Sequence, residues 1–144
     1  MNYIIAGLGN PGEEYINSRH NVGRMFVEDF ARAKNFSAWK ENGKARALSA
    51  EGKIWKEKTL LLLPEGFMNN SGKSIAPFVK SKKAAERLVV IYDDLDLPLG
   101  TLKISFNRGS GGHRGLDSII KALKTREFTR IRIGTSSATP SGKI

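Results

Sequence analysis

The stretch from Gly7 to Gly23, GLGNPGEEYINSRHNVG, decides how this chain begins to fold. Before it, residues 3–6 form a short apolar run that predicts a buried strand. After it, apolar side chains recur with helical spacing, at Val22, Met25, Phe26, Phe30 and Ala33. The stretch is therefore a strand-to-helix loop, and it contains His20, one of only two histidines in the chain.

Two interpretations of this loop compete. Gly7, Gly9 and Gly12 match the G-x-G-x-x-G fingerprint of dinucleotide-binding proteins, in which a helix opens at the glycines and meets the pyrophosphate. Pro11 interrupts that pattern, and the helical spacing starts too late for it. A Gly/Pro turn without function would explain Pro11 but not the polar cluster at residues 18–21, which puts a potential general base beside a helix start.

The rest of the chain alternates predicted strands and helices, the pattern of an α/β domain. Apolar runs at residues 60–63 and 88–92 predict buried strands, and the first follows a hairpin with its expected turn at Glu51-Gly52. Residues 113–123 carry apolar side chains at helical spacing. We therefore predict a single α/β domain over residues 1–144, with a mixed, mostly parallel sheet flanked by helices.

Two further strands are predicted in the C-terminal third. Residues 101–106 alternate between apolar and polar, with three apolar side chains expected toward the core, Leu102, Ile104 and Phe106. The opposite face, with Lys103, is expected to be exposed and basic. Residues 129–133 predict a last strand from which Arg130 and Arg132 point outward.

Composition narrows the possible functions. The chain has no cysteine, which removes disulfides and thiolate metal sites. Its first residues resemble neither a signal peptide nor a membrane span, so we expect a cytoplasmic protein without a membrane partner. Residues 101–144 hold nine basic and two acidic side chains, which is most of the net charge of +10. Nucleic acid is the expected partner, although a basic surface that only aids solubility would give the same balance.

Polar side chains follow each of the three apolar strands, Asn10 after the first, Asn69 after the second and Asp93 after the third. Ligand sites of open α/β sheets form at the carboxyl ends of strands, so we expect these groups and His20 to share one crevice. With Asp93 accepting its Nδ1 proton, His20 could activate water through Nε2. The two carboxamides could stabilise an oxyanion without repelling an anionic substrate.

Other kinds of site remain open in the same motifs. Residues 93–96, with three aspartates, could hold magnesium or calcium. The turn at 97–100 ends that run without further ligands, so we predict no metal and no cofactor. His113 could simply cap the helix that follows it. Neither Ser18 nor Ser71 lies in a G-x-S-x-G elbow, so a serine nucleophile is not favoured.

The loop at 7–23 is followed by FMNNSG at 67–72, DDLDLPLG at 93–100 and GGH at 111–113. In order and spacing these motifs resemble bacterial peptidyl-tRNA hydrolase, and the resemblance covers essentially the whole chain. It implies hydrolysis of the ester that joins a peptide to the 3′ end of tRNA, which releases the peptide and a recyclable tRNA. The implied enzyme is a cytoplasmic monomer. A non-catalytic tRNA- or RNA-binding module of the same fold is the alternative.

The resemblance also implies roles for single residues. His20 would be the catalytic base and Asp93 its orienting partner. The implied substrate-binding residues are Asn10, Tyr15, Asn21, Met68, Asn69, His113 and Arg114. Lys103 and Arg132 are expected to meet tRNA phosphates.

Two features depart from the family pattern. Arg114 stands where the family usually has asparagine in Gly-Gly-His-Asn-Gly, so a guanidinium replaces an amide and is expected to contact phosphate. Family members also continue through a lid segment and a C-terminal helix, whereas this sequence stops at Ile144. For a C-terminally short domain of this kind we expect an exposed apolar patch and weaker affinity for tRNA.

Overall fold

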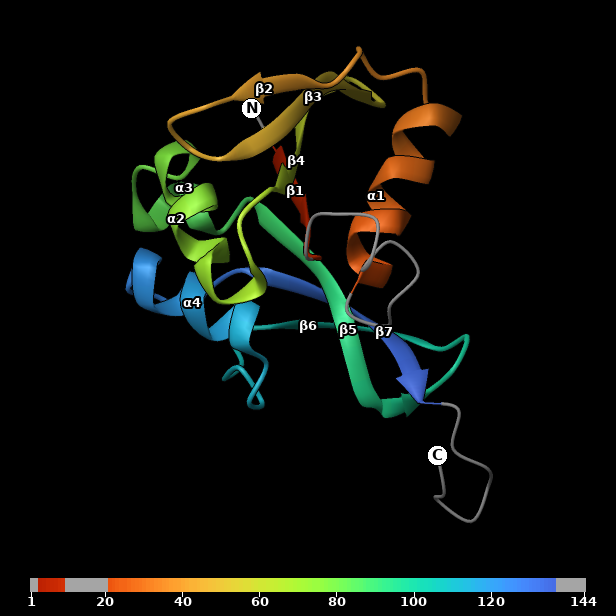
Figure 1. Ribbon diagram of the computed structural model, residues 1–144, viewed down its shortest axis with the longest axis vertical. Coiled ribbons are helices and arrows are strands. Elements are labelled where there is room, and N and C mark those ends of the chain that lie inside the picture. The colour runs from red at the N-terminus through yellow and green to blue at the C-terminus, as the bar shows by residue number, and fades with distance from the viewer. Residues whose placement is uncertain (1–2, 10–20, 137–144) are drawn as a thin grey trace.

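The computed structural model describes residues 3–9 and 21–136, and within them the chain folds into one seven-stranded sheet with helices on both faces (Figure 1). The strand order is β2-β3-β4-β1-β5-β7-β6. Helix α1 covers one face of the sheet, and α2, α3 and α4 lie on the other (Figure 1). Each face has its own apolar cluster, which is the layered arrangement of an α/β domain.

The centre of the sheet consists of four parallel strands, β4 (Glu57–Pro64), β1 (Tyr3–Gly7), β5 (Leu88–Pro98) and β7 (Thr129–Ser136). β1 pairs with both β4 and β5, and β5 pairs with β7. Their continuous apolar runs are typical of strands buried on both faces. The predicted α/β class with a mixed sheet is confirmed. The expectation of a mostly parallel sheet was too strong, because three of the six strand pairings among the described residues are parallel and three are antiparallel.

Antiparallel strands complete the sheet on both sides, β2 (Lys40–Asn42) and β3 (Ala47–Ile54) beside β4, and β6 (Leu102–Phe106) beside β7. The predicted turn at Glu51-Gly52 was wrong, because β3 runs through these residues and the chain turns at Trp55-Lys56. Gly52 has another role: a Cβ there would lie 2.7 Å from the Phe36 ring, which packs over the strand.

The helices are α1 (Val22–Ala33), α2 (Ser71–Ile75), α3 (Lys82–Ala85) and α4 (Arg114–Leu123), with 3-10 turns η3 (Met68–Asn70) and η4 (Ala76–Phe78). The predicted apolar face of the first helix was partly wrong, since Met25 and Phe26 are exposed. The buried face of α1 is formed by Gly23, Val27 and Ala31, spaced four residues apart. Within the described residues, no helix has the length and hydropathy needed to cross a membrane.

Strand β6 lies at the edge of the sheet, and its apolar side chains are exposed. The prediction that they face the core was wrong, because exposure reaches 73% for Ile104 and at least half for Leu102 and Phe106. Alternation identified their shared face correctly but not whether that face is covered. Leu102, Ile104 and Phe106 therefore form an exposed apolar patch on β6.

Candidate active site

The carboxyl ends of β1 and β4 lie beside the middle of β5, because Gly7 pairs with Ile91 in parallel register. The strand predicted at residues 88–92 is longer than expected, since β5 continues through Asp93 to Pro98. Leu8, just past β1, donates its N–H to the Ile91 carbonyl of β5 at 3.0 Å and accepts the N–H of Arg24 at 3.0 Å. The first turn of α1 is thereby bound to the strand ends, close in sequence to Asp93. Asn21 is buried directly before α1.

Three of the predicted site residues, Asn10, Tyr15 and His20, lie outside the described residues. The pairing of His20 with Asp93 therefore stays a prediction. The other predicted residues are described. Asp93, His113 and Arg132 line a cleft, and Asn69 and Arg114 line a separate groove along α4. Asn21, Met68 and Lys103 line neither of these two depressions.

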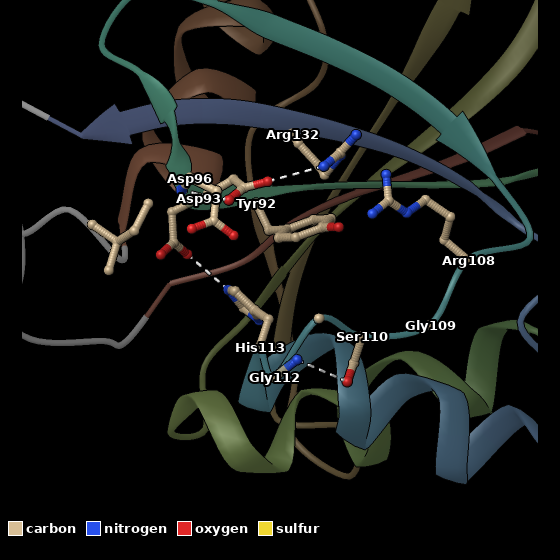
Figure 2. A pocket seen from close by; sticks show the side chains of 12 residues that line it. Tyr92, Asp93, Asp96, Arg108, Gly109, Ser110, Gly112, His113 and Arg132 are labelled. Carbon is tan, nitrogen blue, oxygen red and sulfur yellow. Dashed lines mark hydrogen bonds and ion pairs between the residues drawn. The ribbon is translucent and has the colours of Figure 1, made fainter. Parts of the chain in front are cut away.

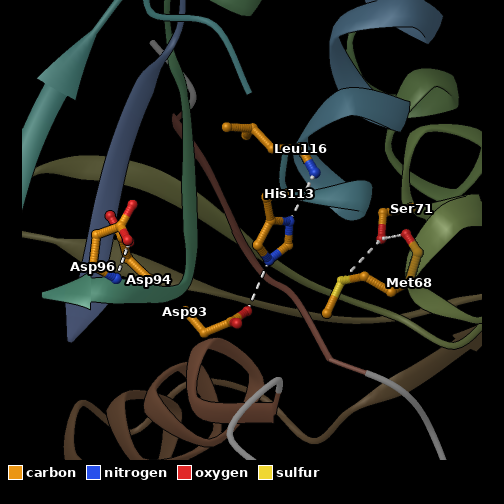
Figure 3. Close-up of polar contacts among 7 residues, drawn as sticks. All are labelled: Met68, Ser71, Asp93, Asp94, Asp96, His113 and Leu116. Atoms are coloured by element: carbon orange, nitrogen blue, oxygen red, sulfur yellow. Dashed lines mark hydrogen bonds and ion pairs between the residues drawn. The ribbon is translucent and has the colours of Figure 1, made fainter. Parts of the chain in front are cut away.

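Asp93 is held by His113, whose Nε2 lies 2.7 Å from Asp93 Oδ1 (Figures 2 and 3). Both side chains are withdrawn from solvent, with exposed fractions of 3% for Asp93 and 11% for His113. The other ring nitrogen, Nδ1, accepts the backbone N–H of Leu116 at 3.2 Å. A nitrogen that accepts a hydrogen bond carries no proton, so we infer that Nε2 bears the proton and donates it to the carboxylate.

This geometry gives His113 two structural roles. It is the N-cap residue of α4, which confirms the capping interpretation of its position. Its ring also packs edge-on against Tyr92, with 4.8 Å between the ring centroids. Because Nδ1 is bound to the helix and Nε2 to Asp93, the ring is suited to fixing the carboxylate and not to taking a proton from water. Sequence reasoning did not predict this pair.

Met68 lies beside the same histidine. A Cβ built on Gly115, in the first turn of α4, would lie 2.5 Å from Met68 Sδ and 3.1 Å from His113 Cε1. A larger residue at this position would require the Met68 side chain to move. Met68 is further fixed because its carbonyl accepts the Ser71 hydroxyl at 2.8 Å (Figure 3). The structure therefore brings Met68 and His113 together, as the site prediction requires.

A cleft of about 320 Å³ opens beside the Asp93–His113 pair (Figure 2). It is lined by residues 92–96 of β5, residues 108–113 of the loop between β6 and α4, and Arg132 of β7. Asp94 accepts the guanidinium of Arg132 at 3.1 Å and the backbone N–H of Asp96 at 2.8 Å. Among the described residues, no three histidine or acidic side chains gather as metal ligands would.

Arg130 was predicted to point outward, and this was wrong because its side chain is fully buried, with 0% exposed. Its guanidinium donates to the carbonyl oxygens of Arg108 and, at 2.8 Å, Arg126. It also lies 4.2 Å from the centroid of the Phe128 ring. The strand alternation correctly placed Arg130 and Arg132 on one face, but it could not reveal that a loop covers this face near Arg130.

Burial has opposite effects on the two titratable groups behind the cleft. It lowers the pKa of Arg130, with the Tyr92 phenol acting in the other direction. It raises the pKa of Tyr92, against the lowering influence of Arg130 and Arg132. The buried guanidinium is therefore retained by the carbonyl groups it binds. Through them it fixes the loop that carries the cleft wall and leads to His113.

The predicted phosphate-binding residues are neighbours. Lys103 of β6 lies directly opposite Arg132 of β7 in the antiparallel register, so both side chains are on the same face of the sheet. Lys103 is exposed, whereas Arg132 is held in the cleft by Asp94. Contact of this pair with RNA stays a prediction.

Asn69 and Arg114 line a different depression from Asp93. They share a groove of about 510 Å³ between η3, α2 and α4, which also contains Lys73 and Lys121. Lys121 pairs with Asp117 at 3.1 Å, but both side chains are exposed, so the ion pair is weak. The three basic side chains of the groove outnumber this one carboxylate. The groove is therefore basic and follows directly from His113 along α4.

Comparison with known proteins gives one consistent result. A sequence model of the family described as peptidyl-tRNA hydrolase matches residues 4–143. A peptidyl-tRNA hydrolase of Herpetosiphon aurantiacus is 47% identical over 134 residues, which are 92% of this chain and 64% of that protein. One from Halalkalibacterium halodurans is 45% identical over 142 residues, with 98% and 76% covered.

Solved structures agree with the sequence relatives. The crystal structure of peptidyl-tRNA hydrolase from Acinetobacter baumannii is similar to this chain with a TM-score of 0.85 and 36% identity, covering 97% of this chain and 72% of that one. A complex of a peptidyl-tRNA hydrolase with N-propanol gives a TM-score of 0.86 at the same identity. The chain thus spans 64 to 76% of the length of these relatives.

Proposed function

The chain belongs to the peptidyl-tRNA hydrolase family, and we propose that it hydrolyses the ester bond between peptide and tRNA in peptidyl-tRNA, releasing free peptide and recyclable tRNA. The observation that supports this most directly is the buried Asp93 carboxylate held by His113 at the carboxyl edge of the central strands. A carboxylate in this position can orient a base, and the adjacent cleft can admit an ester.

We assign the base to His20, from its motif. Its Nε2 takes a proton from water while the water oxygen attacks the ester carbonyl carbon. Asp93 accepts the Nδ1 proton of His20 and stabilises the imidazolium that forms. The hydrogen bond from His113 supports this role, because it holds Asp93 Oδ1 in one orientation. His113 is then a positioning residue.

The attack produces a tetrahedral intermediate, and we assign the stabilisation of its oxyanion to the N–H donors of Asn10. Asn69, in the groove along α4, positions the substrate. When the intermediate collapses, the bond to the ribose oxygen breaks and the imidazolium returns its proton to that oxygen. The products are a free tRNA hydroxyl and a peptide carboxylic acid, which ionises to the carboxylate by releasing its proton to solvent. An ester suits such a site because an alkoxide leaves more readily than the amine anion that an amide would have to expel. We assign Tyr15 and Met68 to the substrate near its acceptor end, and Asn21 to the support of His20 or of the peptide.

Basic side chains on either side of the cleft hold the RNA in this proposal. Lys103 and Arg132 are aligned across β6 and β7, so each can meet a phosphate of the same RNA segment. On the other side, Arg114 and Lys73 line the groove along α4. Arg114, where the family usually has asparagine, would there add a phosphate contact to substrate binding.

We further propose that residues 1–144 act as one peptidyl-tRNA hydrolase-like catalytic domain, in the cytoplasm and as a monomer. The absence of cysteine is consistent with a reducing compartment. The reaction as written needs neither metal nor cofactor, since water, a base and neutral donors suffice for ester hydrolysis.

A single-turnover assay tests the function. The chain, in excess over N-acetyl-aminoacyl-tRNA, should release the N-acetyl-amino acid at a rate that rises with enzyme concentration and then saturates. The competing hypothesis, a module that only binds RNA, predicts retention of the intact ester on a filter with release no faster than spontaneous hydrolysis. That second result would overturn the proposal.

A further inference from the structure

The turn between β3 and β4 exposes a tryptophan almost completely. Trp55 is 95% exposed, the highest value among the large apolar side chains of the described residues. The other tryptophan of the chain, Trp39, packs against the apolar cluster under α1. A side chain of this size normally contributes to stability by burial, and Trp55 does so hardly at all.

The backbone at this turn adds a second cost. Ile54 pairs with Glu57, so the turn has two residues, and Trp55 adopts a positive φ of 58°. Two-residue hairpin turns with a positive φ at the first position favour glycine. A bulky side chain in the left-handed region is an outlier, and such outliers concentrate at functional positions. Fold stability alone therefore does not account for tryptophan here.

The charges beside the turn add a third cost. Lys53 and Lys58 are directly opposite each other in the antiparallel register, and like charges at such positions repel. Lys56 lies in the turn itself, and all three lysines are exposed. No described carboxylate forms an ion pair with any of them, although Glu51 lies in the same depression. This depression, of about 330 Å³, is lined by Lys53 and Lys58 together with Thr59 and Leu60.

We propose that this turn is a second RNA-binding site, at which an unpaired base stacks on Trp55 and the neighbouring phosphates meet Lys53, Lys56 and Lys58. Every base offers a flat face to an exposed aromatic ring, and lysines attract the backbone. A phosphate between Lys53 and Lys58 removes their repulsion. A single exposed ring buries too little apolar area to bind a lipid surface firmly. An acidic peptide would bind the lysines but would not need to stack on the flat face of the Trp55 ring.

The turn site is separate from the catalytic cleft. Because β1, β4 and β5 are parallel, the turn that precedes β4 lies at the edge of the sheet opposite their carboxyl ends. The eight residues of β4 span about 26 Å between these two edges. A single-stranded acceptor end in the cleft therefore leaves Trp55 available, and the site accepts a different unpaired stretch of RNA. The inference does not depend on the proposed hydrolysis.

Fluorescence of a Trp39→Phe variant tests the proposal, because Trp55 is then the only tryptophan. Titration with a short oligouridylate should quench its emission in a saturable way. In the parent chain, Trp55→Gly should weaken binding of the labelled oligouridylate by about 5- to 150-fold in anisotropy measurements. Trp55→Phe should retain part of the affinity, and polyphosphate, which has charge but no bases, should not quench.

Trp55→Gly is also a safe probe of stability, because glycine suits the positive φ. Its melting temperature should equal or exceed that of the parent, and its ester hydrolysis should be unchanged. The proposal is overturned if Trp55→Gly binds oligouridylate as tightly as the parent, or if RNA leaves Trp55 emission unaltered. Quenching by polyphosphate or by anionic vesicles as strong as that by oligouridylate would overturn it as well.

Discussion

The two edges of the parallel sheet use charged side chains in opposite ways. At the carboxyl edge, Asp93 and His113 are withdrawn from solvent and bound to each other. At the opposite edge, Lys53 and Lys58 are exposed and have no ion-pair partner among the described residues. Groups that hold each other in one geometry are suited to chemistry, which requires fixed positions. Exposed, mobile cations are suited to a polyanion, whose phosphates they meet in many geometries.

The largest effect should come from removing the charge of Asp93. Asp93→Asn keeps the shape of the side chain and an oxygen that can accept from His113 Nε2. It loses the carboxylate that stabilises the imidazolium, so kcat for N-acetyl-aminoacyl-tRNA should fall by about 10² to 10⁴ with little change in melting temperature.

Asp29→Asn is the matched control for Asp93→Asn, because Asp29 is an exposed carboxylate on α1 that pairs only with Arg32 among the described residues. Its kcat should equal that of the parent. If both variants kept full activity, the buried carboxylate would have no catalytic role and the contrast between the two edges would fail.

Arg130 supplies a second test, on stability. Arg130→Met fills the space with an apolar chain but leaves the carbonyl groups of Arg108 and Arg126 without their donor. We expect a loss of about 2 to 5 kcal/mol in the free energy of unfolding, measured with urea. Arg32→Met, at an exposed position, should cost less than about 0.5 kcal/mol. Equal stability of the two variants would show that the buried guanidinium does not fix the loop.

The phosphate-binding residues should change salt dependence more than rate. For each of Lys103→Ala and Arg132→Ala, the log-log slope of tRNA binding against salt should become shallower by about one unit, if each residue neutralises one phosphate. Arg114→Asn should give a change in the same direction. Lys34→Ala, on an exposed residue after α1, is the control. If the slopes of Lys103→Ala, Arg132→Ala and Arg114→Asn all equalled that of the parent, the RNA would bind to another surface.

The smallest predicted effect concerns alkaline pH. Burial raises the pKa of Tyr92 in the folded state above its unfolded value of about 10. Its contribution to stability is therefore complete below about pH 10 and is lost as pH rises toward the folded pKa. Tyr92→Phe removes this loss, so its urea midpoint should fall less than that of the parent between pH 8 and pH 11. Parallel decreases would contradict a buried, neutral phenol.

The sequence identified the parts of the site that follow from local rules. Asp93 was predicted because it follows the apolar run at 88–92, and the ends of parallel strands meet at one edge. The strand itself continues past Asp93 to Pro98, so the strand ends beside Asp93 are those of β1 and β4. His113 was considered as a helix cap, and the structure bears this out. Its bond to Asp93 could not be predicted, because the two residues meet only when α4 packs against β5.

The errors share a different cause. The alternation correctly predicted which residues share a face with Arg130 in β7 and which apolar residues share a face in β6. It could not predict whether each face is buried, because that depends on segments distant in the sequence. The turn was placed at Gly52 because glycine usually marks turns, whereas this glycine makes room for Phe36. Tertiary packing thus outweighed the turn preference of Gly52. The turn lies instead at Trp55-Lys56, where the first residue is not a typical turn residue.

The most direct test of the central claim is single-turnover hydrolysis of N-acetyl-aminoacyl-tRNA by His20→Ala beside the parent chain. If a histidine base activates water at the Asp93 edge, the variant should hydrolyse the ester about 10² to 10⁴ times more slowly while binding tRNA with similar affinity. Hydrolysis at the parent rate would contradict the account, since Asp93 and His113 would then be arranged around a base that the reaction does not use.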